Sequence, residues 1–542
     1  MALGLPTDRL AGKLSITDIM TRNKNRKVRA ARRARVALNL LAGVRGRDLR
    51  SGVRFMNLRF AGSPLPMRAA KFARWTADIA IRRVPDSASW FTFGEVSSTP
   101  YWLRDGNPWD GHPWLRGGTL PSSADVVVVG AGFGGASVAY HWSRQANGRL
   151  LLLDRMAPAA GAAGRNAGFL TAAGGSYHGY YVFEPVRAYA ASVLPNLGSE
   201  ALDAIAAGFA DAYVRALSAS VAAIHETIAR ERIECDVRRN GNVVLTDEWD
   251  APRLGAALSL GDQLGWEGWQ RIDAAEVEHR TGIVQPWFAA LQSGTSTWNP
   301  ARWVWGLLDA ALRRGNVELF TRTNVLRVLA DGDGYIVVTD RGDIRARHVV
   351  NATEANTKAV FGEFLRDDPD MIRTHKSQAM YASGDPGVMR GGAITSPLGW
   401  FHPRDTGFLF GSDNVRVPIG EALENRPSRF ISSFMCAEAT RLWPCRPFRV
   451  THEWTGTVGQ APDKFPVIGS LDGANLRMLG GFAGAGSAIS FGSGAEIVQQ
   501  ILGESNAQSL WPDDLFGPGR FAKAARYGER FRPPVAAEAG AR

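Results

Sequence analysis

The sequence has little cysteine and no long apolar run. Its 542 residues include three cysteines, Cys235, Cys436 and Cys445, and none stands in a CxxC pair or at the Cys/His spacing of a zinc site. This scarcity excludes a disulfide-stapled secreted framework and favours a reducing compartment. No apolar stretch approaches the roughly 18 residues that a membrane-spanning helix needs, so we expect a soluble, cytoplasmic body.

Acidic side chains are scarce in residues 1–84. This stretch has 20 Lys and Arg, four Asp and no Glu, a formal charge of +16, whereas the remaining chain has 43 basic and 48 acidic side chains, a charge of −5. The basic character therefore belongs to an N-terminal extension, and no specific nucleic-acid partner is expected for the body.

The extension admits several interpretations. Arg22, Arg26, Arg29 and Arg33 have the spacing of one helix face. The stretch fits a packed or solvated extension, a signal for organelle import or export, or a surface that contacts anionic lipid or a partner.

The rest of the chain has a globular composition. The sequence is 45% hydrophobic and 21% charged, and its length predicts two or more structural units. Residues 85–121 are rich in tryptophan and proline, which discourages long helices. We interpret them as a lead-in, anchored by buried indoles, to the first strand of the body.

One segment has the pattern of a dinucleotide-binding unit. The valines Val126–Val129 are typical of a strand buried on both faces of a parallel sheet. A GxGxxG turn follows and opens a predicted helix over Ala136–Gln145, whose first amides would face phosphates. The turn comprises Gly130, Gly132, Phe133, Gly134 and Gly135.

An acid ends the next predicted strand, Leu150–Leu153. Asp154 lies 19 residues after Gly135, at the distance where a carboxylate accepts hydrogen bonds from an adenosine ribose. An acid at this position disfavours a 2′-phosphate. The unit is therefore predicted to bind FAD or NAD, and not NADP.

The next loop, GAAGRNAGFLTAAGGSYHG from Gly161 to Gly179, resembles the flavin loop of the D-amino-acid oxidase superfamily, in particular its glycine, sarcosine and gamma-glutamylputrescine oxidase-like branch. Ala163 replaces the usual serine. The lead-in motif PYWL, the helix and strands that begin at NPARW, and a C-terminal block with PVIG and a glycine-rich turn are also similar to that branch. The resemblance covers roughly Ser98 to Gly503.

The resemblance implies an α/β (α+β) fold in which a Rossmann-like FAD-binding domain is interleaved with a mixed-sheet substrate domain. The expected FAD-domain pieces are residues 122–195, 296–365 and 449–503, the substrate-domain pieces are 196–295 and 366–448, and an exposed tail covers 504–542. Beyond the glycine turn and Asp154, the implied FAD contacts are Arg155, Gly164, Arg165, Asn166, Ala167, Gly168, Val325, Gly481, Phe482, Gly484, Ala485, Gly486 and Ser487.

The implied chemistry is oxidation of a C–N bond of an amine or amino acid. A neutral amine gives hydride to flavin N5 and the imine then hydrolyses, so no strongly basic catalytic residue is required and we nominate none. The cysteine that binds flavin in monomeric sarcosine oxidases has no counterpart in EWTGTVGQAPDKFP, so noncovalent FAD is expected. Their oxygen-activating lysine is also missing from Phe408–Gly411, which leaves oxygen and a quinone or carrier protein both open as electron acceptor.

Substrate-pocket candidates come from the predicted strand Thr406–Gly411 and its surroundings. They are His178, Phe401, His402, Arg404, Arg416 and Trp454. Either arginine can hold a carboxylate by a bidentate contact or lie at the surface, and the histidines and tryptophan can equally be structural. Two rival functions stay open: a flavoenzyme acting on a macromolecule-bound group, and a noncatalytic dinucleotide-bound scaffold. No metal site is predicted.

Overall fold

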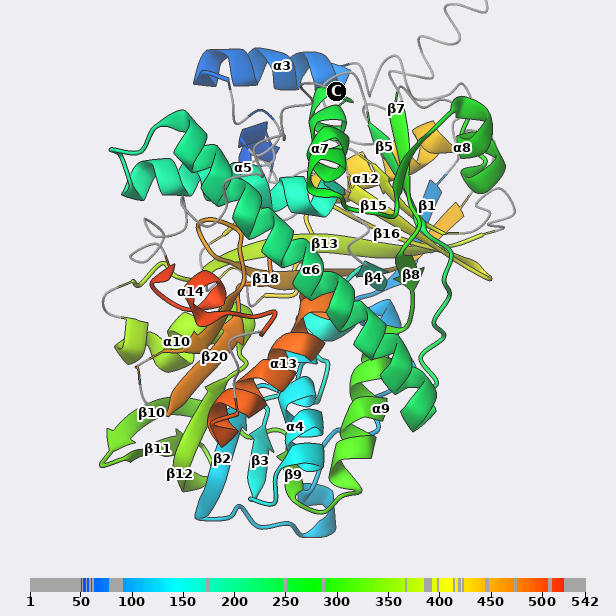
Figure 1. Ribbon diagram of the computed structural model, residues 1–542. Coiled ribbons are helices and arrows are strands. Elements are labelled where there is room, and N and C mark those ends of the chain that lie inside the picture. Colours follow the sequence, from blue (N-terminus) through cyan, green and yellow to red (C-terminus); the bar gives the residue numbers. More distant parts are fainter. Residues whose placement is uncertain are drawn as a thin grey trace, which may run out of the picture.

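The computed structural model describes residues 50, 52–54, 56–57, 60, 63–77, 91–171, 176–246, 251–284, 288–365, 368–384, 392–396, 399–412, 415–417, 421, 424–443, 448–471, 473, 475–504 and 509–520. The predicted arginine face of residues 22–33 and Cys445 lie outside these ranges. Helix α3 (Leu65–Ala77) belongs to the extension and lies at the top of Figure 1.

The first sheet has eight strands in the order β10-β11-β12-β2-β3-β9, with β20 beside β12 and β19 beside β20. Its members are β2 (Ser123–Val129), β3 (Leu150–Leu153), β9 (Val317–Phe320), β10 (Val325–Asp331), β11 (Gly334–Thr339), β12 (Gly342–Asn351), β19 (Val467–Ser470) and β20 (Leu476–Gly480). Strands β20, β12, β2, β3 and β9 run parallel, and β10 and β11 add an antiparallel edge.

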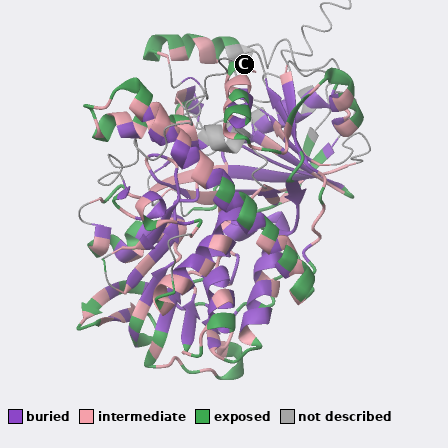
Figure 2. Cartoon of the chain, viewed as in Figure 1, coloured by how far each residue is buried: buried purple, intermediate pink, exposed green. Residues whose placement is uncertain are grey.

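Both faces of this sheet are buried, as the valine run predicted. Val126 and Val128 belong to a core formed with α4 (Phe133–Gln145), α9 (Pro300–Leu312) and α13 (Gly486–Leu502), which cover one face in Figure 1. Val127 and Val129 pack into a second core on the other face. Successive side chains of a strand point to opposite faces, so a strand covered on both sides is apolar throughout. Figure 2 shows the buried interior of the sheet.

The second sheet has ten strands in the order β1-β18-β13-β16-β15-β14-β5-β7-β6, with β17 beside β13. They are β1 (Phe91–Ser97), β5 (Asn242–Thr246), β6 (Trp269–Ile272), β7 (Phe288–Gln292), β13 (Arg373–Ser383), β14 (Ala393–Ser396), β15 (Gly399–Arg404), β16 (Gly407–Ser412), β17 (Val415–Arg416) and β18 (Phe448–Gln460). One face packs against α8 (Ala274–Thr281) and α12 (Arg429–Leu442) through an aromatic core that includes Phe401, Phe408 and Phe410.

The remaining elements join and cover the two sheets. They are α5 (Ser176–Val193), α6 (Ser199–Glu231), α7 (Ala251–Leu264), α10 (Thr357–Phe361), α14 (Asp513–Phe516), the small sheet of β4 (Phe169–Thr171) and β8 (Thr295–Thr297), and the short 3-10 turns η2 (Tyr101–Leu103), η3 (Trp114–Arg116), η4 (Ala162–Gly164), η5 (Glu354–Asn356) and η6 (Gly362–Leu365). Figure 1 shows α6 running diagonally across both halves.

The chain alternates between the sheets, so the predicted interleaved α/β fold is confirmed. Strands β2–β3, β9–β12 and β19–β20 enter the eight-stranded sheet, and β1, β5–β7 and β13–β18 enter the ten-stranded one. Strand β18 lies in the stretch 449–503 and pairs in the ten-stranded sheet, while the lead-in contributes β1 parallel to β18. The domain boundaries stay a prediction. None of the helices in the described part of the chain is long and apolar enough to cross a membrane.

Candidate functional site

A cavity of about 740 Å³ is lined by residues of both sheets. At one end it is bordered by the glycine turn after β2 and by Asp154 and Val325, and at the other by Asn242, Thr395 and Trp400 of the ten-stranded sheet. The carboxyl ends of parallel strands are where open α/β sheets bind ligands. The arrangement brings the predicted dinucleotide unit and the second sheet to one site.

The glycine turn has no room for side chains. Gly130 has φ +106°, and a Cβ there would lie 2.6 Å from the carbonyl oxygen of Ala352, at the end of β12. A Cβ at Gly135 would collide with the carbonyl of Gly130, so helix α4 lies directly against the strand. Helix α4 begins at Phe133 after Gly132, and no side chain caps its first turn. Its first amides are therefore available to an anion.

Two backbone N–H groups, one in the glycine turn and one just after Asp154, hold the Asp154 carboxylate. Its carboxylate oxygens accept hydrogen bonds from the N–H groups of Ala131 and Met156, each at 2.7 Å. Burial raises the pKa of Asp154, and these two hydrogen bonds oppose the rise. The carboxylate lies on the cavity wall with Arg155 and Val325 nearby on the same lining, which fits recognition of an adenosine ribose.

Residues 161–168 are called the flavin loop. Three ring N–H groups from separate segments hold this loop by donating to successive carbonyl oxygens. Trp454 Nε1 donates to the carbonyl of Arg165 at 3.0 Å and Trp102 Nε1 donates to that of Asn166 at 2.8 Å. His402 Nδ1 donates to the carbonyl of Ala167 at 2.8 Å. Burial lowers the pKa of His402 to about 3, so the ring is neutral. Three consecutive carbonyls are thus bonded to protein, while residues 165–167 also line the cavity.

Gly168 closes this loop in a conformation that suits glycine. Its φ is +69°, and a Cβ would lie 2.5 Å from Trp102 Cζ2, 2.8 Å from the Trp298 carbonyl oxygen and 2.9 Å from His402 Nδ1. Its N–H donates to the Asn166 side chain at 2.8 Å. The aromatic groups that hold the loop therefore also require a glycine at its end.

The C-terminal glycine-rich turn forms another wall. Phe482, Gly484, Ala485, Gly486 and Ser487 line the cavity as helix α13 begins. Gly484 has φ +99°. Ser487 Oγ donates to the carbonyl of Phe169 at 2.8 Å, which ties this turn to the strand after the flavin loop.

The roof formed by Asn242, Thr395 and Trp400 is polar. Asn242 Nδ2 donates to Thr395 Oγ1 and to Gln292 Oε1, each at 3.2 Å, across neighbouring strands β5, β14 and β7. Trp400 follows on β15 and faces Thr395 in register. Its indole occupies the space over Gly411, where a Cβ would collide with the ring. This wall presents an amide, a hydroxyl and an indole to the cavity.

The predicted cofactor residues divide into lining and supporting positions. Most of them line the cavity, whereas Gly135, Gly164, Gly168 and Gly481 do not. These four glycines shape the wall because a Cβ at each would collide with, or approach within 3 Å of, a neighbouring group.

Four of the six substrate-pocket candidates, Phe401, His402, Arg404 and Trp454, do not line the cavity. Phe401 stacks on Phe410 at 5.9 Å in the aromatic core, on the face away from the cavity. His402 and Trp454 are fully buried and hold the flavin loop. His178 lies in α5 and Arg416 in β17, and their side chains lie outside what the structure describes.

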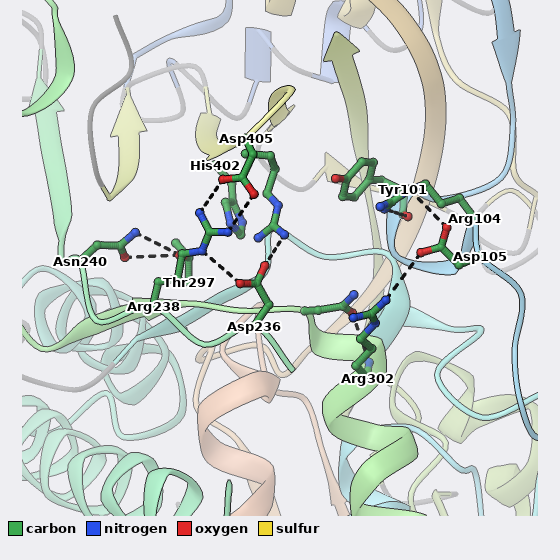
Figure 3. A network of polar contacts seen from close by, with 12 residues as sticks. Tyr101, Arg104, Asp105, Asp236, Arg238, Asn240, Thr297, Arg302, His402 and Asp405 are labelled. Atoms are coloured by element: carbon green, nitrogen blue, oxygen red, sulfur yellow. Dashed lines mark hydrogen bonds and ion pairs between the residues drawn. The ribbon is translucent and has the colours of Figure 1, made fainter. Parts of the chain in front are cut away.

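Arg404 belongs to an ion-pair network instead of the pocket. Its guanidinium bonds to Asp236, and its side chain is 12% exposed. Arg238 bridges Asp236 and Asp405 in the same network, which Figure 3 shows. Although burial raises the pKa of Asp236, Arg404 and Arg238 outweigh that effect and lower it. Arg404 is also not among the residues that line the cavity.

Sequence reasoning missed several residues of this site. Trp102 lies in the PYWL motif, but its bond to the flavin loop was not foreseen. Glu354 follows the end of β12 and lines the cavity. Asn242 and Thr395 stand on short apolar strands where nothing in the pattern distinguishes them.

The eight-stranded sheet is Rossmann-like, and its glycine turn and Asp154 border a cavity that the second sheet covers. This combination defines a dinucleotide-dependent oxidoreductase. The chain belongs to the DAO family of FAD dependent oxidoreductases, whose family model matches residues 125–500.

Individual relatives agree with this assignment. The hydrogen cyanide synthase subunit HcnC of Pseudomonas aeruginosa is 25% identical over 369 residues, which cover 64% of this chain and 84% of that protein. Glycine oxidase from Geobacillus kaustophilus superposes with a TM-score of 0.59 at 17% identity, over 74% of this chain and 99% of that one. L-Proline dehydrogenase from P. horikoshii gives a TM-score of 0.56 at 16% identity, over 74% and 99%. The two structures show a shared fold.

FAD is the cofactor that the family implies, and the residues present fit it. The uncapped start of α4 suits its phosphates and Asp154 suits its ribose. The flavin loop and the start of α13 line the continuation of the cavity towards the polar roof.

Proposed function

We propose that this protein oxidises a C–N bond of a small amine or amino acid, with noncovalently bound FAD as hydride acceptor. The observation that carries the proposal is the continuity of one cavity from the glycine turn to the roof of Asn242, Thr395 and Trp400. The solved relatives named as glycine oxidase and L-proline dehydrogenase support a substrate of this class.

FAD held by the glycine turn, Asp154 and the flavin loop would supply the hydride acceptor for the substrate carbon. The chain contributes positioning, since Trp102, Trp454 and His402 fix the loop that lines this part of the cavity. Such fixed geometry lowers the entropic cost of bringing the reacting atoms together. The roof offers the amide of Asn242, the hydroxyl of Thr395 and the indole of Trp400 to orient a polar substrate.

The electron acceptor is proposed to be oxygen or a quinone or carrier protein. Leu409, in the strand where the related oxidases place a lysine, is fully buried. Lys376 on the neighbouring strand β13 donates to the carbonyl of Glu421. Mixing the anaerobically reduced protein with oxygen in a stopped-flow instrument separates the alternatives, because a dehydrogenase reoxidises slowly in air and rapidly with a quinone.

The central experiment is an anaerobic screen of amines and amino acids against the flavin absorption band. We expect at least one compound to bleach the band and to yield the imine hydrolysis product. A protein that binds FAD and is reduced by dithionite, but by no amine or amino acid, contradicts the proposal. Acid precipitation should release all the flavin; pigment that stays with the chain contradicts noncovalent attachment.

A roof variant tests where the substrate binds. Thr395→Val removes the hydroxyl at nearly constant volume and should slow reduction by the substrate about tenfold, as expected for one lost hydrogen bond of about 1.4 kcal/mol. FAD content should not change. Thr92→Val, at an exposed position of β1 away from the cavity, is the matched control. Equal reduction rates in both variants would place the substrate elsewhere.

A further inference from the structure

Glu354 occupies an unusual position on the wall of the cofactor cavity. It follows β12 at the start of η5 and has φ +54°, in the left-handed region that residues other than glycine rarely adopt. Such a conformation costs about 1–3 kcal/mol and persists only where the surroundings impose it. The side chain lines the cavity. A strained acid in a cofactor site invites a functional explanation.

The carboxylate of Glu354 bridges two further segments of the wall. Oε2 accepts the N–H of Gly459 at 2.5 Å, at the end of β18, and Oε1 accepts the N–H of Phe482 at 3.1 Å, in the glycine-rich turn. A Cβ at Gly459 would lie 2.5 Å from Oε2, so the close approach requires glycine there. The Glu354 carboxylate therefore links the end of β12 to the end of β18 and to the glycine-rich turn.

No basic side chain of the described residues forms an ion pair with Glu354. The elements packed against η5 are α10, β13, β18 and β20. Their ionisable groups are Lys358, Arg373, His375, Lys376, Tyr381, Arg449, His452, Glu453 and Arg477. Burial raises the pKa of Glu354 to about 7, the backbone hydrogen bonds from Gly459, Phe482 and Ala355 oppose the rise, and none of those nine groups contributes to it.

The backbone just before Glu354 packs against the glycine turn that is expected to bind phosphate. The Ala352 carbonyl, two residues before Glu354, packs against Gly130, and the Ala352 methyl would be 3.7 Å from a Cβ at Gly134. The pyrophosphate of FAD brings negative charge to this turn. Two anionic groups on one wall shielded from water repel each other, and the carboxylate can avoid the repulsion by taking up a proton.

We propose that Glu354 couples FAD binding to proton uptake, so that the cofactor is held by the form of the protein in which this side chain is a neutral acid. The proposal rests on the FAD site and not on the identity of the amine. Its success or failure is therefore separate from that of the oxidation chemistry.

The sign of the coupling follows from linkage. If bound FAD raises the pKa of Glu354 above its value in the free protein, affinity is full below that value and falls as the pH rises through it. Because the free value is about 7, affinity should be constant near pH 6 and weaken about tenfold per pH unit above neutrality until the pKa of the complex is reached.

The experiment is a titration of the deflavinated full-length chain with FAD between pH 6 and 9. For the unmodified protein we expect the dissociation constant to rise above neutral pH. Calorimetry at pH 8 in buffers of different ionisation enthalpy should show uptake of about one proton. Glu354→Gln, which cannot titrate, should bind FAD with a pH-independent constant and no proton uptake. Glu363→Gln, at an exposed position of η6, is the matched control and should behave like the unmodified protein.

A second variant covers the case in which Glu354→Gln does not fold. Glu354→Gly adopts the left-handed backbone without strain and also lacks the carboxyl group, so it too should lose the pH dependence. The proposal is overturned if the unmodified protein binds FAD equally at pH 6 and 9. It is also overturned if the folded variants keep the same slope and proton uptake, or if FAD proves to be covalently attached.

Discussion

The indole N–H of Trp454 donates to the carbonyl oxygen of Arg165 over 3.0 Å, between residues 289 positions apart in the chain. This bond makes β18, a strand of the ten-stranded sheet, a support of the flavin loop that follows β3 in the other sheet. Trp454 is fully buried and acts on the cofactor site through the backbone. The Trp454 ring N–H therefore positions the flavin loop.

Trp454→Phe should therefore weaken FAD binding while the substrate roof is unchanged. The variant keeps the aromatic ring but leaves a buried carbonyl without its donor, at a cost of about 1–3 kcal/mol. We expect a lower melting temperature and a FAD dissociation constant raised about tenfold, measured by fluorescence titration. Trp109→Phe, which alters a lead-in indole in edge contact with His112, should change neither. Equal FAD affinities for the two variants would contradict the positioning role.

Gly168→Ala should abolish retention of the flavin. The added methyl group meets Trp102, His402 and the Trp298 carbonyl, and φ +69° disfavours any Cβ. Backbone strain of about 1–2 kcal/mol adds to overpacking of about 1–3 kcal/mol. Gly255→Ala, in α7 at a position that does not line the cavity and has nothing within 4 Å of the new methyl group, should purify with full flavin. A fully yellow Gly168→Ala protein would show that the loop is not held in this way.

Arg404→Gln should reduce stability without a selective effect on carboxylated substrates. The change leaves Asp236 with Arg238 alone in a partly buried network, and we expect a loss of about 1–3 kcal/mol in the free energy of unfolding. The ratio of kcat/KM between an amino acid and the corresponding amine should stay the same. A ratio that falls by more than tenfold would return Arg404 to the substrate site.

Asp463 and Arg520 form the most enclosed ion pair of the described residues, with side chains 2% and 6% exposed. Arg520 bonds both carboxylate oxygens and also donates to the carbonyls of Phe465 and Pro466. Removing one partner of a buried pair costs about 3–5 kcal/mol because the other charge stays buried. Asp463→Asn should lower the denaturant midpoint strongly, whereas Asp370→Asn, in an exposed pair with Arg373, should change it little.

Local patterns predicted the dinucleotide unit because each of its requirements is local. A strand buried on both faces needs consecutive apolar residues, and the turn needs glycine where Ala352 and helix α4 approach. The helix and strands expected from NPARW onward, by resemblance to the family, correspond to α9 and the strands that follow it, and Gly315, with φ +84°, lies just after the helix.

The roles of His402 and Trp454 could not be read from the sequence. A ring N–H near a cofactor loop can face a substrate or a backbone carbonyl, and only the tertiary packing decides between them. Arg404 is a similar case, since its partner Asp236 is 168 positions away. Glu354 was overlooked because a left-handed backbone at a residue other than glycine leaves no signal in the residue type.

The repeated passage of the chain between the two sheets also determines how the protein can come apart. A single peptide-bond cut cannot separate the sheets, because each is built from three stretches that alternate along the sequence. Fragments expressed separately would each carry strands of both sheets with edges left unpaired. Limited proteolysis should accordingly give nicked species that stay associated, and neither half should be obtained as an autonomous module.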